Sequence, residues 1–317
     1  AQARDRRAVL AHDGHAGVSA TPARRAALAA LREVRGGELA GRALARTFDT
    51  LAPPDRAWTQ ELVLGTLRLR GRIDHLLGQL VHRGLEALEP DVLDVLRLGA
   101  YQLLEMGSVP PYAAVSQSVE LARDAGAGRG SAGFVNGVLQ SLRRRHGELR
   151  FPDFERDPVA HLETWGSHPR WLVERWVRQF GAGGARALVE ANNRRPELYI
   201  RVIGLRIEDA LERLGERGIR AEAVDFAPDA LRIAPPATAA EALAAVPAVV
   251  QDPAAGLVVR YAGVAPGSRV ADLCAAPGGK AVALAGDLAA AGGAGGYVVA
   301  ADVSFARLAR VRENAER

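Results

Sequence analysis

A short apolar segment that runs into a glycine pair and then into a helical pattern limits the possible folds of this chain most. Arg269–Leu273 has the length and apolar character of a buried strand, and Gly278 and Gly279 precede an alanine-rich helix over 280–290. A second apolar run, Tyr297–Asp302, leads into another helix. Strand, helix, strand and helix in this order predict the beginning of a doubly wound parallel α/β sheet.

The chain before residue 198 shows only helical periodicity, with apolar residues recurring at intervals of three, four and seven. One such helix is predicted over 62–80. A strand candidate at Leu198–Val202 and two later extended pieces predict a small α+β subdomain. The chain is therefore expected to be multi-domain, with an all-helical first domain. The expected segments are a mobile leader over 1–20, a helical domain over 21–147, a linker and small α+β subdomain over 148–236, and the first part of an α/β domain over 237–317.

Composition excludes several classes of protein. No apolar run approaches the ~20 residues of a membrane span, and the charged start lacks the apolar centre of a secretory signal. The single cysteine excludes an internal disulfide framework and fits a reducing cytoplasm. His75 and His82 have no metal-ligand spacing, so no metal site is expected. The net charge of +4 does not predict a uniformly basic surface.

The glycine pair predicts a binding site for a nucleoside-containing cofactor. A glycine turn between a strand and a helix lets a ligand approach backbone N–H groups at the positive helix end. Asp302 lies 22 residues after Lys280 (302 − 280), at the end of the next strand. An acidic residue at that position can accept hydrogen bonds from ribose hydroxyls.

Two common nucleotide motifs are absent from this turn. A phosphate-binding P-loop would need glycine at Cys274 and serine or threonine at Ala281. The dinucleotide pattern Gly-x-Gly-x-x-Gly also fails, because Gly278 and Gly279 are adjacent. S-adenosylmethionine then fits the spacing best, and a glycine turn that only packs a helix on a sheet is the alternative.

The segment Asp272–Lys280, with the sequence DLCAAPGGK, closely resembles the cofactor-binding motif of the Sun/Fmu family of RNA cytosine-5 methyltransferases. Ala281 departs from the threonine usual in that family, and Gly292–Gly296 is an unusually loose stretch. The resemblance covers nearly the whole chain beyond the leader. Other matching segments are Tyr101–Leu104 with Pro110-Pro111, Phe134–Leu139, His168–Leu172, Ala191–Pro196 and Val250–Asp252.

This resemblance implies an N-terminal NusB-like RNA-binding domain and the first part of a Rossmann-like, S-adenosylmethionine-dependent methyltransferase domain. It implies methylation of carbon 5 of a cytosine in 16S ribosomal RNA, in a cytoplasmic protein expected to be a monomer. Asp302 would contact the ribose of the cofactor, and Lys280 would place a positive charge near its carboxylate or near the substrate phosphate. The residues implied to bind the cofactor are Cys274, Ala275, Ala276, Pro277, Gly278, Gly279, Lys280 and Asp302.

The resemblance also implies covalent catalysis by a cysteine, because carbon 5 of cytosine becomes nucleophilic only after a thiolate adds to carbon 6. Cys274 lies in the cofactor turn, with no evident base beside it, and is expected to be a small turn residue. In the family the catalytic cysteines follow the cofactor loop. The nucleophile is therefore expected downstream of Arg317, no catalytic residue is expected within this chain, and the chain alone is expected to be inactive.

Two arginine clusters are candidates for RNA phosphate contacts. The alternative is that they are solvated charges in an arginine-rich chain. A competing function is a non-catalytic NusB-like RNA-binding or assembly module, and a nucleotide-dependent dehydrogenase is a third reading. The candidate RNA-binding residues are Arg143, Arg144, Arg145, Arg194 and Arg195.

Overall fold

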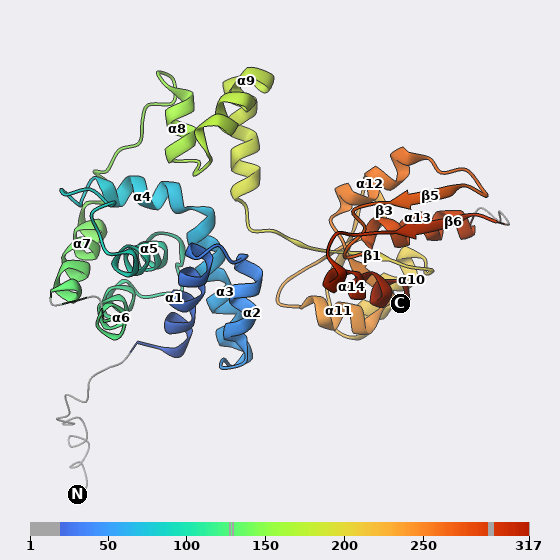
Figure 1. The fold of residues 1–317 in the computed structure, drawn as a ribbon, viewed down its shortest axis with the longest axis horizontal. Helices are drawn as coiled ribbons and strands as arrows, with labels where there is room; N and C mark the ends of the chain where they lie inside the picture. The colour runs from blue at the N-terminus through green and yellow to red at the C-terminus, as the bar shows by residue number, and fades with distance from the viewer. Residues whose placement is uncertain (1–19, 127, 129, 291–294, 317) are drawn as a thin grey trace, which may run out of the picture. The chain divides into compact units, whose positions relative to one another are not determined.

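The computed structural model describes residues 20–126, 128, 130–290 and 295–316. The chain divides into two compact units, which meet in sequence between Arg194 and Arg195, and Figure 1 shows the elements of each. The leader predicted over 1–20 lies outside the described residues apart from Ala20, and most of Gly292–Gly296 lies outside them as well.

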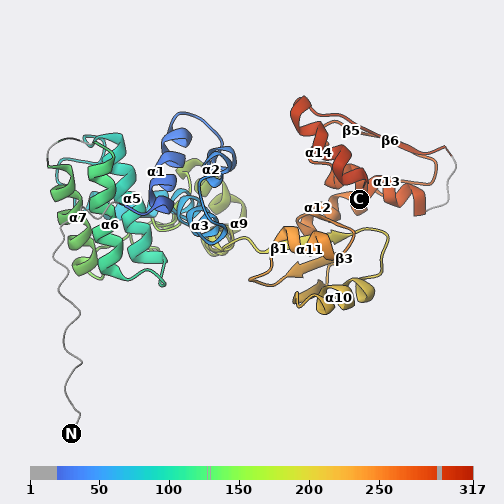
Figure 2. The same cartoon turned by 90° about the horizontal axis from the view of Figure 1, so that it is seen from below.

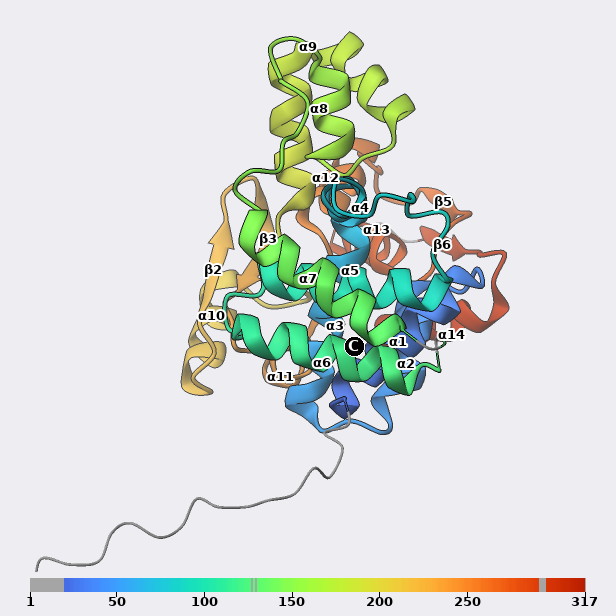
Figure 3. The same cartoon turned by 90° about the vertical axis from the view of Figure 1, so that its left-hand side faces the viewer.

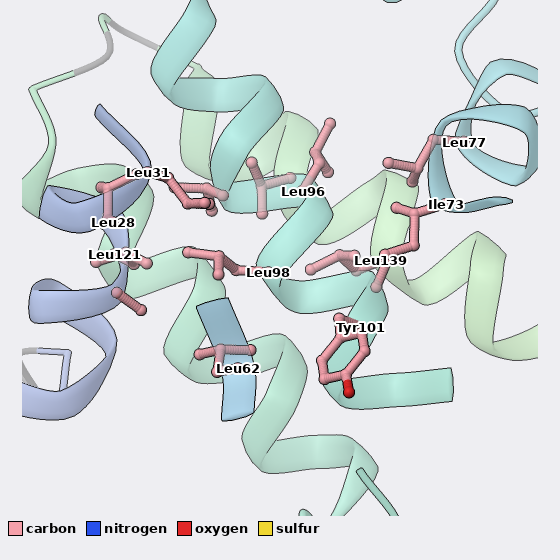
Figure 4. Close-up of a cluster of buried hydrophobic side chains, with 14 of the residues drawn as sticks. Leu28, Leu31, Leu62, Ile73, Leu77, Leu96, Leu98, Tyr101, Leu121 and Leu139 are labelled. Carbon is pink, nitrogen blue, oxygen red and sulfur yellow. The ribbon is translucent and has the colours of Figure 1, made fainter. Parts of the chain in front are cut away.

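The first unit begins with a bundle of helices around one apolar core, as the helical periodicity predicts. Figure 4 shows leucines from successive helices meeting with Tyr101 in this core. Proline in the first turn starts α1, α3, α5 and α6, where its missing N–H leaves no helical bond unmade. The bundle helices are α1 (Pro22–Arg35), α2 (Ala40–Phe48), α3 (Pro53–Arg68), α4 (Arg70–Gly78), α5 (Pro90–Glu105), α6 (Pro111–Asp124) and α7 (Ser131–Arg145).

Two glycines let the bundle helices approach closely. A Cβ on Gly65 of α3 would lie 2.0 Å from the ring of Tyr101 in α5, and one on Gly99 would lie 2.6 Å from Leu139 in α7. The Tyr101 hydroxyl donates to Glu61 over 2.7 Å, which satisfies the polar end of this buried ring. The glycines are therefore packing residues rather than helix breakers.

The helix predicted over 62–80 is two helices. α3 ends and α4 begins around Leu69, whose backbone is at φ −100° and ψ 18°. Leu62 and Ile73, on either side of the break, are both fully buried in the same core. The apolar period continues across the break for that reason, so periodicity alone could not detect it.

A pair of helices, α8 (Pro158–Thr164) and α9 (Arg170–Asn193), completes the first unit. They lie side by side, as Figures 1 and 3 show, and α9 bends at Gly181, which adopts φ +71°. The expected linker after residue 147 was wrong over Pro158–Thr164, where α8 forms because the Asp157 side chain caps it by accepting from the Ala160 N–H over 2.9 Å. Among the described residues, no helix combines the length and apolar composition needed to cross a lipid bilayer.

The second unit begins with a small antiparallel sheet of strand order β2-β3-β1-β4. Three of these strands were predicted from the sequence, and β4 is a fourth strand beyond the predicted end of the subdomain at residue 236. Ile200, Leu231 and Ala248 form the core of the subdomain with residues of α10 and α11, two helices packed against the sheet (Figure 2). Its elements are β1 (Leu198–Val202), α10 (Ile207–Glu216), β2 (Ala221–Val224), β3 (Ala227–Ile233), α11 (Ala239–Ala245), β4 (Ala248–Val250) and α12 (Pro253–Ala262).

The second unit ends with a parallel strand–helix–strand arrangement. β5 (Arg269–Asp272) pairs with β6 (Tyr297–Ala300), so that Asp272 lies opposite Ala300. The helix α13 (Gly279–Ala290) connects them and packs against both strands, and α14 (Phe305–Glu316) follows. The order matches the pattern predicted from the glycine pair, and the two strands form a parallel two-stranded sheet.

Candidate functional site

The loop between β5 and α13 is held at the carboxyl ends of the two parallel strands. The Ala275 N–H donates to the Ala301 carbonyl over 2.9 Å, and the Ala301 N–H donates to the Asp272 carbonyl over 2.8 Å. Gly278 adopts φ +108°, and a Cβ there would lie 3.0 Å from the Val311 backbone of α14. Only glycine combines this backbone angle with this approach. These backbone bonds and the angle at Gly278 therefore define the shape of the loop in this structure.

The Asp302 carboxylate fastens this loop to the end of β6. One of its oxygens accepts from the Ala276 N–H over 3.1 Å, and the other accepts from the Ser304 N–H over 2.9 Å. The side chain is only 5% exposed. Each carboxylate oxygen keeps a second acceptor position.

Hydrogen bonds from backbone amides hold the pKa of Asp302 below the usual aspartate value. The Ser304 N–H contributes most, and the Ala276 N–H and the charge of Arg307 lower the pKa further, against an opposing effect of burial. Because the folded-state pKa is lowered, the contribution to stability is complete above the unfolded-state pKa. It is lost only as the pH falls through the lowered value. Asp302 is thus an anion throughout the neutral range.

Residues of α14 hold the outer side of the loop. Arg307 donates to the Ala276 carbonyl over 2.7 Å, and Asn314 donates to the Pro277 carbonyl over 2.8 Å. Arg307 also lies 4.0 Å from the Asp302 carboxylate. The Ala276 and Pro277 carbonyls are therefore bonded to side chains of α14, a helix that comes later in the sequence than the glycine pair.

A buried arginine of the antiparallel sheet reaches the start of α13. Arg201 of β1, 8% exposed, donates through Nε to Oε1 of Gln251 over 2.6 Å and through a terminal nitrogen to the Gly279 carbonyl over 3.3 Å. Burial lowers its pKa from the usual arginine value. A Cβ on Gly279 would lie 3.2 Å from Nε2 of Gln251. The small sheet therefore supports the glycine turn from a second side.

Two buried side-chain atoms and several backbone N–H groups beside this turn lack a hydrogen-bond partner in the described residues. Oδ2 of Asp272 and Nε2 of Gln251 are buried and have no hydrogen-bond partner among the described residues. The first N–H groups of α13 also have no carbonyl partner within the helix, and they point toward its positive end. Such an arrangement can hold the hydroxyl, amino and carboxylate groups of a nucleoside-containing cofactor. The part of the chain that the structure describes contains no cluster of side chains suited to a metal ion.

The structure brings the predicted cofactor residues together, because Asp302 bonds directly to the loop 274–280. Cys274 and Lys280 are exposed at the two ends of the loop, while Ala275 and Ala276 are buried. Sequence reasoning missed Arg201, Gln251, Arg307 and Asn314 as supports of the loop. Only Gln251 had a signal, since it lies in a segment noted for the family resemblance.

The predicted RNA-binding arginines are exposed and fall in two separate segments of the chain. Arg143, Arg144 and Arg145 lie in the last turn of α7, and Arg145 pairs with Glu148 over 3.2 Å. Arg143 lines a cavity of about 230 Å³ with apolar residues of α5 and α7. Arg194 and Arg195 fall on either side of the boundary between the two units. Their contacts with RNA stay a prediction.

Two family models match separate segments of this chain. Residues 21–144 match the NusB family, and residues 168–240 match the ferredoxin-like domain of RsmF/B-like methyltransferases. The crystal structure of PH0851 superposes with a TM-score of 0.68 over 94% of this chain and 67% of that one, at 20% identity, which shows the fold.

Several bacterial relatives have the name ribosomal RNA small subunit methyltransferase B. The Pseudomonas putida protein is 36% identical over 303 residues, which are 93% of this chain and 66% of that protein. The Pseudomonas syringae protein is 34% identical over 93% of this chain and 64% of its own length. A Mycobacterium tuberculosis protein named as a methyltransferase, Rv1407, is 36% identical over 84% of this chain.

The chain spans less than two thirds of the length of these relatives, 60% in the case of Rv1407. Within that span it carries a NusB domain followed by the ferredoxin-like domain of RsmF/B-like methyltransferases. The chain therefore belongs to the Sun/Fmu family of ribosomal RNA small subunit methyltransferases.

Proposed function

We propose that this chain is the RNA-binding and cofactor-binding part of an enzyme that methylates carbon 5 of a cytosine in 16S ribosomal RNA, with S-adenosylmethionine as methyl donor. The observation that carries the proposal is the loop 274–280, fastened by Asp302 at the ends of two parallel strands. The names of the relatives support methylation of ribosomal RNA. We infer that β5, α13 and β6 begin a Rossmann-like methyltransferase domain of a cytoplasmic, monomeric protein.

The residues of the loop have distinct proposed roles. The N–H groups at the start of α13 bind the polar groups of the cofactor, and Gly278 and Gly279 keep the surface free of side chains. Asp302 accepts a hydrogen bond from a ribose hydroxyl while it holds Ala276. Lys280, exposed at the start of α13, places its ammonium group near the cofactor carboxylate or the RNA phosphate. The bound cofactor supplies an electrophilic methyl group.

The proposed reaction needs a thiolate that attacks carbon 6 of the cytosine. Its addition makes carbon 5 nucleophilic, and carbon 5 would take the methyl group as the methyl–sulfur bond breaks and S-adenosylhomocysteine leaves. Loss of the carbon 5 proton to a base would then break the bond to carbon 6 and release the thiolate. We assign Cys274 to the cofactor turn rather than to this role, since it lies in the turn itself, where its N–H donates to Oδ1 of Asp272 over 3.1 Å. We propose that a cysteine beyond Arg317 supplies the thiol.

Replacement of Cys274 by serine tests this assignment. In the protein encoded by the complete gene, C274S is expected to keep methyl transfer to 16S ribosomal RNA within about threefold, since serine preserves the size of the turn residue. Transfer of labelled methyl groups, with 5-methylcytosine identified by mass spectrometry, measures the result. Total loss of transfer with normal S-adenosylmethionine binding would show that Cys274 is the nucleophile. A wild-type protein that binds ribosomal RNA but transfers no methyl group would favour the non-catalytic module.

A further inference from the structure

The first half of α9 has one face that packs against the protein and one that has no partner. Val173 is fully buried, and Trp176 and Val177 pack with it against the core residues Leu162 of α8 and Val189. These contacts fix which side of the helix faces inward. The opposite side of these helical turns faces away from the core and is available to bind another molecule.

Three residues share that free side because they are spaced by four and three along the helix. They are Trp171, Arg175 and Arg178, and we call them the α9 stripe. Seven residues of helix span about 10 Å. Stacked nucleotides of one strand rise by about 3.4 Å each, so the stripe matches a run of about three nucleotides.

Trp171 is unusual among the tryptophans of this chain because 64% of it is exposed. Trp58, Trp165 and Trp176 are all packed against apolar clusters. A large aromatic ring on the surface exposes apolar area that folding would normally remove from water. Nothing in the described part of the chain covers this ring.

The two arginines of the stripe have no compensating charge. Across residues 20–126, 128, 130–290 and 295–316, neither Arg175 nor Arg178 forms an ion pair or a hydrogen bond. Their neighbours on the same helix do pair, Arg170 with Glu174 over 3.1 Å and Arg186 with Glu190 over 3.0 Å. The stripe thus offers two free cations beside one open aromatic face.

We propose that the α9 stripe binds single-stranded RNA, with one base stacked on Trp171 and flanking phosphates on Arg175 and Arg178. Aromatic rings stack any base, and arginine pairs with phosphate oxygens, so a single strand satisfies both groups at once. A protein partner would have to bring a flat apolar group and two carboxylates in the same 10 Å spacing, about the length of the stripe. The choice of RNA rests on the proposed function, and the surface itself rests on the geometry of α9.

Replacing Trp171 tests the stacking contact. The 317-residue chain is titrated against a fluorescein-labelled, mixed-sequence single-stranded RNA of about 16 nucleotides, the upper end of common site sizes, with anisotropy as the readout. W171A is expected to weaken binding about tenfold, and W171F is expected to recover most of the loss because phenylalanine also stacks. The melting temperature should not change, because the Trp171 side chain is mostly outside the core.

The arginines are tested through the salt dependence of binding, which a purely structural role would leave unchanged. Loss of two phosphate contacts reduces the slope of log K against log salt by about 1.4 for single strands. The double variant R175Q/R178Q should show this change. The matched control is R213Q/R217Q at the end of α10, which removes two exposed arginines without an ion pair and changes the net charge equally. Its slope should stay at the wild-type value.

The outcomes separate this inference from the proposed function. If the wild-type chain binds the RNA and the stripe variants bind within twofold of it, the α9 stripe is not an RNA site, while the proposed function stands. If stripe variants instead change self-association in sedimentation and leave RNA affinity intact, the stripe is a protein interface and the inference fails. If the wild-type chain does not bind this single-stranded RNA, the inference is refuted, and methyl transfer to 16S ribosomal RNA by the protein from the complete gene decides the proposed function separately. Stripe-dependent RNA binding, together with no methyl transfer by the protein encoded by the complete gene, would refute only the proposed function.

Discussion

Replacement of Asp302 by alanine is expected to weaken S-adenosylmethionine binding by a factor on the order of a hundred. The variant loses a ribose acceptor, and it also frees the Ala276 and Ser304 N–H groups that the carboxylate now holds. Hydrogen bonds to charged groups are among the stronger ones, and each N–H left unpaired adds a cost of its own. Calorimetric titration of the protein from the complete gene measures the loss.

Two further variants make the Asp302 result specific. D302N keeps one carbonyl oxygen but turns the other acceptor into a donor that faces a backbone N–H, so an intermediate affinity is expected. E313A removes an exposed carboxylate from α14, beside Asn314 but without a contact to the loop, and should bind the cofactor normally. Equal affinities for D302A, E313A and the wild type would contradict the role given to Asp302.

Replacement of Arg201 by leucine is expected to weaken S-adenosylmethionine binding about tenfold, an effect of one strong hydrogen bond. The variant leaves Gln251 and the Gly279 carbonyl without the guanidinium that holds them. The free energy of unfolding should fall by less than the loss of these two hydrogen bonds alone would predict. The buried cation has no carboxylate within ion-pair distance in the described residues, and its removal ends a desolvation cost.

A residue that positions the loop should affect the affinity for the cofactor more than it affects the free energy of unfolding. Arg232 on the neighbouring strand β3 provides the matched control, because its ion pairs with Glu197 and Glu222 are exposed. R232L should leave cofactor affinity unchanged and stability little changed. Urea unfolding and calorimetry on both variants give the comparison. An R201L variant that loses stability but binds the cofactor as well as R232L would show that Arg201 only supports the fold.

Local signals in the sequence were enough to predict the framework of the candidate site. The glycine pair between two apolar runs predicts β5, α13 and β6, because the φ of +108° at Gly278 is accessible mainly to glycine. Helical periodicity predicts the bundle but not the break at Leu69, since Leu62 and Ile73 enter the same core. Periodicity reports which face is buried, and it does not report where one helix stops.

The supports of the loop could not be predicted because they depend on tertiary contacts. Arg201 precedes Gly279 by 78 residues (279 − 201), and an arginine in a short strand carries no sign that it will be buried. The spacing of Asp302 predicted a ribose acceptor, but only the structure shows that both carboxylate oxygens already bind backbone N–H groups. A role inferred from spacing was therefore incomplete: Asp302 also builds the loop.

The most direct test of the central claim is equilibrium binding of S-adenosylmethionine to the protein encoded by the complete gene, with NAD as the competing ligand. We expect one molecule of S-adenosylmethionine to bind per chain, with D302A strongly impaired and no heat from NAD. Binding of NAD in place of S-adenosylmethionine, or S-adenosylmethionine binding that is indifferent to D302A, would contradict the assignment of the loop 274–280 as the methyl-donor site.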